Sequence, residues 1–202
     1  MKHIITINRQ FGSGGRELGR RLADNLGIAY YDHEIVLELM KRTHLTESYI
    51  RQIEERRAIP LLPITIGRTL AFPAHQMVAQ SQSVFLGQRD IILEMAEKSD
   101  CVIVGRCADY ILRQKNPLRI FAYADMDARI ARCRLKGEDA RHLTDRELQR
   151  QILSIDKQRA QYYEFYTDQT WGEKAHYDLC LNTTHLDLKK SAELMAQFIR
   201  RV

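Results

Sequence analysis

The sequence predicts an α/β domain with a mainly five-stranded parallel sheet, and two observations lead to that prediction. Short apolar, β-branched runs recur along the 202 residues, and segments with helical periodicity separate them. A strand that is followed by a helix returns to the next strand in a parallel direction, so this alternation predicts helices on both faces of one sheet. The length suits a single domain over residues 1–202.

The first strand, turn and helix give the clearest local signals. His3–Asn8 is a short β-branched run that precedes a glycine-rich turn. Glu17–Leu26 has leucines at helical spacing, and Gly27 suits the C-terminal cap of that helix. A strand, a glycine turn and a helix in this order predict the opening of a βαβ unit.

The rest of the sheet follows from similar runs. Ile28–Tyr31 predicts a short second strand, and Asp32 suits the N-cap of a helix over His33–Lys41. Three further apolar runs complete the predicted sheet: Cys101–Val104, Leu118–Ala124 and Tyr177–Leu181.

Two stretches interrupt the alternation of strands and helices. Thr46–Gln88 contains Pro60, Pro63 and Pro73 and has few strand signals. Lys136–Trp171 is polar, charged and aromatic, with a helical run over residues 147–166. Insertions at the carboxyl ends of parallel strands commonly enclose ligands. We therefore expect both stretches to lie over that edge of the sheet.

Composition excludes a disordered chain and narrows the class of partner. The sequence is 45% hydrophobic and 28% charged, as in ordinary folded domains. Its net charge of +5 favours anionic partners, but no nucleic-acid recognition motif accompanies that charge, so nucleic acid is not expected. The four cysteines lack metal-ligand spacing, and no long apolar run or signal segment is present. We expect no membrane partner and a cytoplasmic location.

The turn between the first strand and the first helix is the strongest candidate binding site. Its glycines let the backbone aim several N–H groups at one anion, and the following helix N-terminus adds positive potential. The turn departs from the pattern G-x-x-x-x-G-K-[ST], because an arginine and a glutamate replace the lysine and the hydroxyl residue. A tight turn without a ligand stays an alternative. The candidate phosphate-binding residues are Gly12, Ser13, Gly14, Gly15, Arg16 and Glu17.

Most of the chain resembles the bacterial cytidylate kinase-like family of P-loop proteins. The resemblance implies a P-loop NTPase-like three-layer sandwich with a helical acceptor-binding insertion over residues 45–88 and a lid over 136–171. It also implies transfer of the γ-phosphoryl group of ATP, or another nucleoside triphosphate, with Mg²⁺ to a nucleoside monophosphate or another small acceptor. The matching segments are Ile7–Gly19, Tyr30–Asp32, Val102–Leu112, Leu118–Arg134, Asp156–Tyr163 and Tyr177–Thr183.

The resemblance and the chemistry together identify candidate catalytic residues. Asp32, Arg106 and the pair Asp156 and Arg159 match substrate-binding and lid positions of cytidylate kinase, and Arg16 is a feature of the family's loop. Phosphoryl transfer depends on positioning and on neutralising phosphate charge, which suits these arginines. The simpler readings are an N-cap for Asp32, a surface arginine at 106, and an exposed ion pair between residues 156 and 159.

Three substitutions fall on groups that grip the acceptor nucleotide in cytidylate kinase. Cys107 replaces an acidic residue, Ile152 replaces an arginine, and Glu38 lies near the position of another arginine. Arg9 and Arg68 are further candidates to meet the acceptor. We therefore expect the 45–88 insertion to select the acceptor, and the acceptor itself stays undetermined.

Two other classes of function remain open alongside a kinase. Without the usual lysine and hydroxyl, the chain could be a non-catalytic nucleotide-binding or sensor module. A nucleic-acid binder is supported by basic charge alone. The ligands of the metal are unknown from the sequence, with Glu17, Asp32 and Asp109 as candidates. The sequence does not decide between a monomer and a homodimer.

Overall fold

The computed structural model describes residues 3–50, 72–136 and 142–201 and contains one five-stranded parallel sheet. The strand order is β2-β3-β1-β4-β5, which confirms the predicted sheet. The predicted strands differ from the observed ones only at their ends. The strands are β1 (Ile4–Arg9), β2 (Ala29–Tyr31), β3 (Cys101–Val104), β4 (Leu118–Tyr123) and β5 (Leu179–Asn182).

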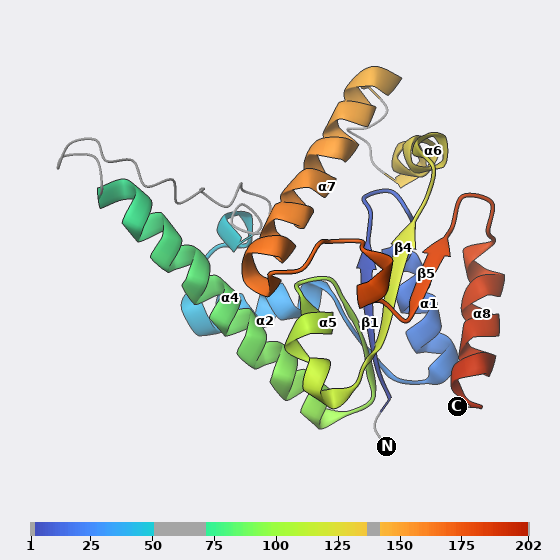
Figure 1. The fold of residues 1–202 in the computed structure, drawn as a ribbon, viewed down its shortest axis with the longest axis horizontal. Coiled ribbons are helices and arrows are strands. Elements are labelled where there is room, and N and C mark those ends of the chain that lie inside the picture. The colour runs from blue at the N-terminus through green and yellow to red at the C-terminus, as the bar shows by residue number, and fades with distance from the viewer. Residues whose placement is uncertain (1–2, 51–71, 137–141, 202) are drawn as a thin grey trace.

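Helices connect these strands and cover the sheet (Figure 1). Gly27 adopts a left-handed conformation (φ 70°) and caps the first helix, as predicted. The helices are α1 (Gly15–Leu26), α2 (His33–Thr43), α4 (Phe72–Lys98), α5 (Ala108–Ile111), α6 (Met126–Lys136), α7 (Asp145–Thr167) and α8 (Leu188–Ile199), with 3₁₀ turns at Arg113–Lys115 and Lys174–His176.

The two faces of the sheet are covered by different helices, which makes three layers. Side chains alternate along β3: Val102 packs with α1 and α8, whereas Ile103 packs with α2 and α4. Leu22 of α1 and Ile92 of α4 are fully buried in these two clusters. The predicted three-layer sandwich is therefore confirmed, and the side chains on both faces of its central strands are buried.

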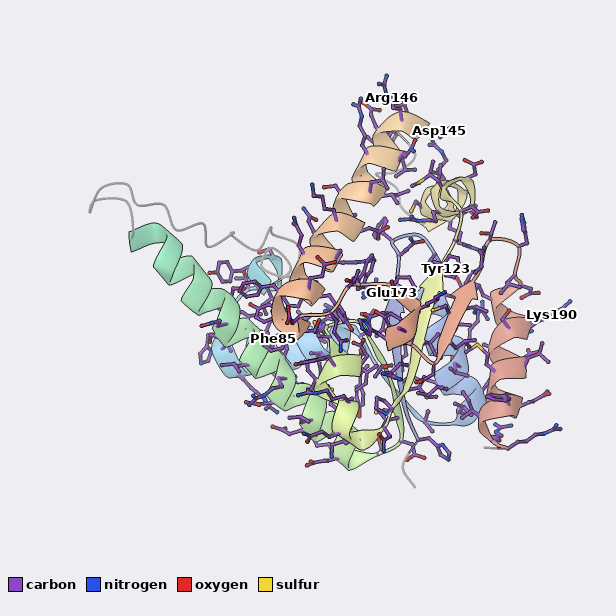
Figure 2. The ribbon with its side chains drawn as sticks, viewed as in Figure 1. Phe85, Tyr123, Asp145, Arg146, Glu173 and Lys190 are labelled. Carbon is purple, nitrogen blue, oxygen red and sulfur yellow. The ribbon has the colours of Figure 1, made fainter. Side chains whose placement is uncertain are left out.

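Helix α7 contains the helical run predicted over residues 147–166. Thr144 begins it with a capping box, in which its hydroxyl accepts from the Glu147 amide and its own amide donates to the Glu147 carboxylate. The far end of α7, with Asp145 and Arg146, projects away from the sheet (Figure 2). Its other end packs on α4, where the rings of Phe85 and Tyr166 stack with centroids 4.0 Å apart.

The predicted acceptor-binding insertion is partly described. Residues 72–88 form the first part of α4, which continues without a break to Lys98, so the predicted boundary at Gln88 falls inside a helix. Residues 51–71, including Arg68, lie outside the described residues. A search of the described part of the chain finds no helix with the length and apolar character needed to span a membrane.

The sheet places three chain segments at one edge. In the parallel register Ile7 pairs with Val104, and Tyr31 pairs with Ile103, so β1, β2 and β3 end at nearly the same level. The residues that follow these strands are the glycine loop, Asp32 and Gly105-Arg106. Here "glycine loop" denotes residues 10–14. This edge is where open α/β sheets bind ligands.

Candidate functional site

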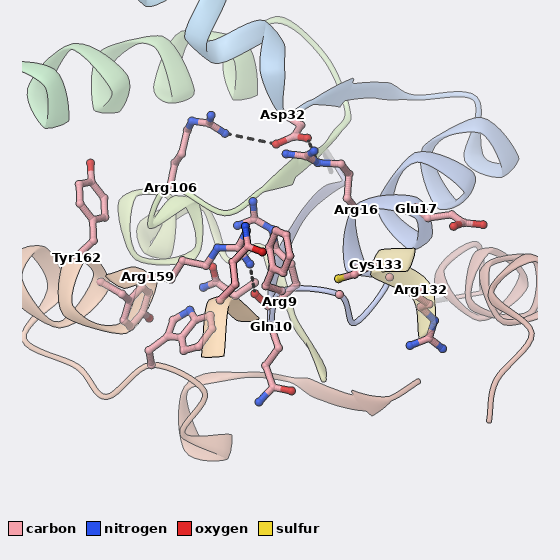
Figure 3. A pocket seen from close by; sticks show the side chains of 18 of the residues that line it. Arg9, Gln10, Arg16, Glu17, Asp32, Arg106, Arg132, Cys133, Arg159 and Tyr162 are labelled. Carbon is pink, nitrogen blue, oxygen red and sulfur yellow. Dashed lines mark hydrogen bonds and ion pairs between the residues drawn. The ribbon is translucent and has the colours of Figure 1, made fainter. Parts of the chain in front are cut away.

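A cavity of about 820 Å³ opens at the carboxyl ends of the strands (Figure 3). Its wall combines the glycine loop and the start of α1 with residues that follow β2 and β3. Helices α6 and α7 contribute the opposite part of the wall, including Arg132, Cys133 and Arg159. The volume is in the range of small-molecule sites.

The glycine loop has the geometry that anion binding requires. Gly12 and Gly14 have φ angles of 76° and 82°, which side chains rarely allow. The first helical hydrogen bond of α1 runs from the Leu18 amide to the Gly14 carbonyl, at 2.9 Å. Arg16 and Glu17 therefore lie in the first turn, where amide groups and the helix dipole attract anions. Gly12, Gly14, Gly15, Arg16 and Glu17 all line the cavity, as the sequence predicts for a phosphate site.

Ser13 lies elsewhere than the sequence suggested. Its side chain is fully buried and is absent from the cavity wall. Its hydroxyl accepts from the Gly15 amide at 3.4 Å, and its carbonyl accepts from the Thr183 hydroxyl at 2.6 Å. The left-handed residues on either side turn Ser13 inward, so its hydroxyl lies against the Gly15 amide and not on the cavity wall, and its contact with a phosphate stays a prediction.

Replacing Gly12 with alanine should cost more stability than replacing Gly27. Both glycines have positive φ, so each alanine costs about 1 kcal/mol of backbone strain. A Cβ at Gly12 would also lie 2.9 Å from the Arg129 carbonyl oxygen, whereas no atom lies within 4 Å of one at Gly27. Denaturant unfolding of the two variants measures the difference. Equal losses would contradict the close packing of α6 on the loop.

Arg9, Arg16 and Arg106 act on Asp32 on the other side of the loop (Figure 3). Asp32 is 4% exposed, and its carboxylate contacts Arg16 (Nε to Oδ2, 2.5 Å) and Arg106 (Nη1 to Oδ1, 3.5 Å). Burial raises the pKa of Asp32, but Arg9, Arg16 and Arg106 outweigh it and hold that pKa below its ordinary value. Asp32 therefore stays a carboxylate.

Asp32 begins α2 without capping it. The sequence suggested a capping side chain, and the residue does occupy the N-cap position. However, its carboxylate makes no cap hydrogen bond, because Arg16 and Arg106 engage it. Glu34 instead accepts from the Asp32 amide at 2.9 Å. The side chain of Asp32 therefore contacts the arginines of the cavity and does not cap the helix.

Arg9 lies at the centre of this cationic group. Its guanidinium fits against Gly105, where an added Cβ would lie 2.1 Å from Nη1. Burial lowers the pKa of Arg9 to about 9, together with repulsion from Arg159, Arg106 and Arg16, while Asp32 opposes that change. As far as the described residues form it, the cavity wall carries six arginines and two carboxylates, Glu17 and Asp32, so positive charge is in excess. The site favours a multiply charged anion.

Arg106 is held in an unusual backbone conformation. Gly105, Arg106 and Cys107 have successive positive φ angles of 74°, 54° and 55°. For the two non-glycine residues this conformation costs roughly 1 kcal/mol or more each. The turn points Arg106 at Asp32 rather than into solvent, and its side chain is 10% exposed. The simpler reading of Arg106 as a surface arginine is therefore wrong.

Asp156 and Arg159 face the loop from helix α7. Arg159 donates to the Arg9 carbonyl at 3.2 Å and lies over the ring of Phe11, 5.4 Å from its centroid. Asp156 accepts from the Phe11 amide at 2.7 Å and pairs with Arg129 of α6. Within α7, Arg159 Nη1 lies 4.0 Å from Asp156 Oδ1. The predicted pair is thus partly buried, and its stronger partners lie on the loop and on α6.

Few carboxylates are available for a metal ion. Among the described residues no group of three or more potential metal ligands is present. Glu17 lines the cavity at the first turn of α1, and its Oε1 accepts from Arg21 Nε at 3.0 Å. Asp109 is 4% exposed, lies off the cavity wall and has a pKa raised by burial. Because Mg²⁺ takes few protein oxygens beside phosphates, Glu17 fits such an ion and Asp109 does not.

The residues that differ from cytidylate kinase occupy three different surroundings. Cys107 lines the cavity beside Tyr162. Ile152 is fully buried in α7, and Glu38 accepts from Arg42 on the surface of α2. Of these positions, Cys107 is on the cavity wall. The wall near it is aromatic and apolar where cytidylate kinase has an acidic group.

Sequence reasoning missed three residues that hold the loop: Arg129, Arg132 and Thr183. Arg129 donates to the Phe11 carbonyl at 2.7 Å, and Arg132 contacts the Ser13 carbonyl at 3.4 Å. The available signal was the spacing of two arginines one helical turn apart after a strand. That spacing alone does not distinguish arginines that are buried against the loop from arginines on a solvent-exposed helix face.

Comparisons with known proteins identify the family and the fold of the chain. Residues 4–185 match the model of the cytidylate kinase-like family. The chain is 25% identical to a cytidylate kinase of Thermosipho melanesiensis, over 97% of this chain and 96% of that one. A solved, uncharacterized protein from Eubacterium ventriosum is similar with a TM-score of 0.69 and 24% identity over both whole chains. A shikimate kinase from Bacteroides thetaiotaomicron has a TM-score of 0.60 and 16% identity over 99% of each chain. These two structures establish the fold.

Proposed function

Because the chain belongs to the cytidylate kinase-like family, we propose that it transfers the γ-phosphoryl group of a nucleoside triphosphate to a nucleoside monophosphate or another small acceptor. One observation carries the proposal: the glycine loop and an excess of arginines face the same cavity. Phosphoryl transfer needs two phosphate-bearing groups held in line with their charge neutralised. The cavity offers adjacent anion sites for both.

The glycine loop binds the triphosphate of the donor in this proposal. Amides at the start of α1 contact the phosphates, and Arg16 neutralises charge where the pattern G-x-x-x-x-G-K-[ST] has lysine. The side chain of Arg16 is 61% exposed, so it can turn from Asp32 to a phosphate without unpacking the core. ATP is the donor that we expect.

The acceptor occupies the side of the cavity formed by arginines at the end of β1, after β3 and on α7. Arg9, Arg106 and Arg159 surround this space and hold its anionic group. An acceptor oxygen attacks the γ-phosphorus, the bond to the bridging oxygen breaks, and the nucleoside diphosphate leaves with that oxygen. Asp32 accepts hydrogen bonds from the arginines and keeps their forks oriented between turnovers.

Among the described residues, Glu17 is the candidate to hold Mg²⁺ on the donor side. Glu17 would hold the ion, directly or through water, next to phosphates bound on the loop. When bound, the ion supplies neutralisation of phosphate oxygens. Asp32 contributes less to such a site, because two guanidinium groups already occupy its oxygens.

Turnover with a panel of acceptors tests the proposal. ATP and Mg²⁺ are combined with each common nucleoside monophosphate and with nucleosides, and formation of ADP is measured. We expect acceptor-dependent ADP formation, preceded by a thermal shift with ATP because a bound ligand stabilises the fold. Binding of nucleotide without turnover on any acceptor would instead support the sensor alternative. Absence of both binding and turnover would refute the proposal.

A further inference from the structure

Helix α6 contacts the glycine loop and also contributes Arg132 and Cys133 to the cavity wall. It carries Arg129 and Arg132 one helical turn apart, and both donate to backbone carbonyls of the loop. Arg129 serves the carbonyl of Phe11, and Arg132 serves that of Ser13. The intervening and following residues, Gly12 and Gly14, line the cavity.

The Phe11 contact is built from charged, buried groups. Arg129 is 3% exposed, and its Nε donates to the Phe11 carbonyl at 2.7 Å. Its Nη2 pairs with Asp156, whose other oxygen accepts from the Phe11 amide at 2.7 Å. Both polar groups of one loop residue are therefore fixed by one ion pair. Burying such a pair is costly unless its members are hydrogen-bonded, and here each member also bonds a backbone group of Phe11.

The Ser13 contact has a second donor. The hydroxyl of Thr183, just after β5, donates to the Ser13 carbonyl at 2.6 Å, and Thr183 is fully buried. Arg132 donates to the Thr183 carbonyl and approaches the Thr183 hydroxyl at 3.3 Å. Arg132 and Thr183 thus form one unit against the Ser13 carbonyl.

The planar peptide bond transmits these contacts to the cavity. All peptide bonds between described residues are trans, so each carbonyl points opposite to the N–H of the next residue. Holding the Phe11 carbonyl toward α6 turns the Gly12 amide away from α6. Holding the Ser13 carbonyl toward Thr183 turns the Gly14 amide away from Thr183. Within the described part of the chain, neither amide donates to another backbone group.

We propose that Arg129 and Thr183 are positioning residues, which orient the Gly12 and Gly14 amides for an anion by fixing the carbonyls behind them. Arg132 assists Thr183 in this role. The inference rests on the proposed function, since it requires an anion on the loop. Arg129 and Thr183 are both absent from the cavity wall, so they act through the loop and not by touching the ligand.

Titration with inorganic pyrophosphate, followed by ¹⁵N NMR of the glycine amides, tests the proposal. In the unaltered chain both the Gly12 and Gly14 amides should shift on binding. Thr183→Val should weaken pyrophosphate binding about tenfold and diminish the Gly14 shift, because a donor to one carbonyl is lost. Arg129→Met should weaken binding similarly and diminish the Gly12 shift. Thr183→Ser, which restores the hydroxyl, should restore both the affinity and the Gly14 shift.

Arg113→Met is the matched control. Arg113 is exposed and donates to the Tyr110 carbonyl at 2.7 Å, outside the cavity, so its loss should leave pyrophosphate binding unchanged. Folded Thr183→Val and Arg129→Met variants that bind pyrophosphate normally, with unaltered amide shifts, would overturn the proposal. If Arg129→Met does not fold, the difference in pyrophosphate binding between Thr183→Val and Thr183→Ser tests the proposal. Failure of the unaltered chain to bind pyrophosphate would instead refute the phosphate site itself.

Discussion

Arg106→Ala is expected to lower kcat by about a hundredfold or more, the range found when one preorganised donor to a transition state is removed. Arg106 lines the cavity at the carboxyl end of β3 and points at Asp32 across the acceptor side. Arg106→Lys should be nearly as slow, because an ammonium cannot reproduce the planar fork. Steady-state kinetics with saturating ATP measures the change.

The backbone at position 106 allows the loss of activity to be separated from a loss of stability. Its φ of 54° is strained for alanine and relaxed for glycine. Arg106→Gly should therefore be about 1 kcal/mol more stable than Arg106→Ala and equally inactive. Arg113→Ala, which removes an exposed arginine outside the cavity, should keep full activity. Near-normal turnover by Arg106→Ala would contradict a role for Arg106 in stabilising the transition state.

Asp32→Asn is expected to lower the free energy of unfolding by about 3 kcal/mol, because it removes the buried carboxylate whose charge opposes Arg9, Arg16 and Arg106. Sulfate or phosphate should restore part of that loss by binding the same arginines. Denaturant unfolding, with and without sulfate, measures both effects. A variant as stable as the unaltered chain would contradict the charge balance inferred for the site.

The difference in free energy of unfolding between the unaltered chain and Asp32→Asn depends on pH through the pKa of Asp32. Its folded pKa lies below the value of about 3.9 that applies when the chain is unfolded. The stabilising contribution is therefore complete above about pH 4, and it declines as the pH falls through the folded pKa. The stability gap between the unaltered chain and Asp32→Asn should narrow in that range.

Asp178→Asn is the matched control for Asp32→Asn. Arg119 lowers the pKa of Asp178 as well, chiefly through a hydrogen bond, but the Asp178 side chain is 40% exposed. A surface pair of this kind contributes about 1 kcal/mol or less. The control should lose little stability and gain nothing specific from sulfate. A loss comparable to that of Asp32→Asn would point to a general electrostatic effect.

Local sequence patterns predicted those parts of the fold that depend on neighbouring residues. The β-branched run before the glycines and the leucine spacing after them gave β1 and α1, because period and turn chemistry are local. The helix nevertheless begins at Gly15, before the predicted start at Glu17. Glycine is a poor helix former, but an added Cβ at Gly15 would lie 2.5 Å from the Arg9 Cβ, so close packing requires it there.

Parts of the site escaped prediction because they depend on contacts distant in sequence. The sequence around Asp32 predicts an N-cap, but in the fold the ends of β1 and β3 place arginines beside its carboxylate. Asp156 reads as half of an i,i+3 pair, but its buried partner Arg129 lies 27 residues earlier. Ser13 reads as a phosphate ligand, although the φ angles of its neighbours turn it inward. Three-dimensional contact, and not residue type, decides each of these roles.

A crystal structure with a non-hydrolysable ATP analogue and Mg²⁺ is the most direct measurement of the phosphate site. We expect a phosphate within hydrogen-bonding distance of the amides of residues 12–16, with Arg16 moved from Asp32 toward it. An analogue bound elsewhere, with those amides directed to protein atoms and Arg16 still on Asp32, would contradict this expectation.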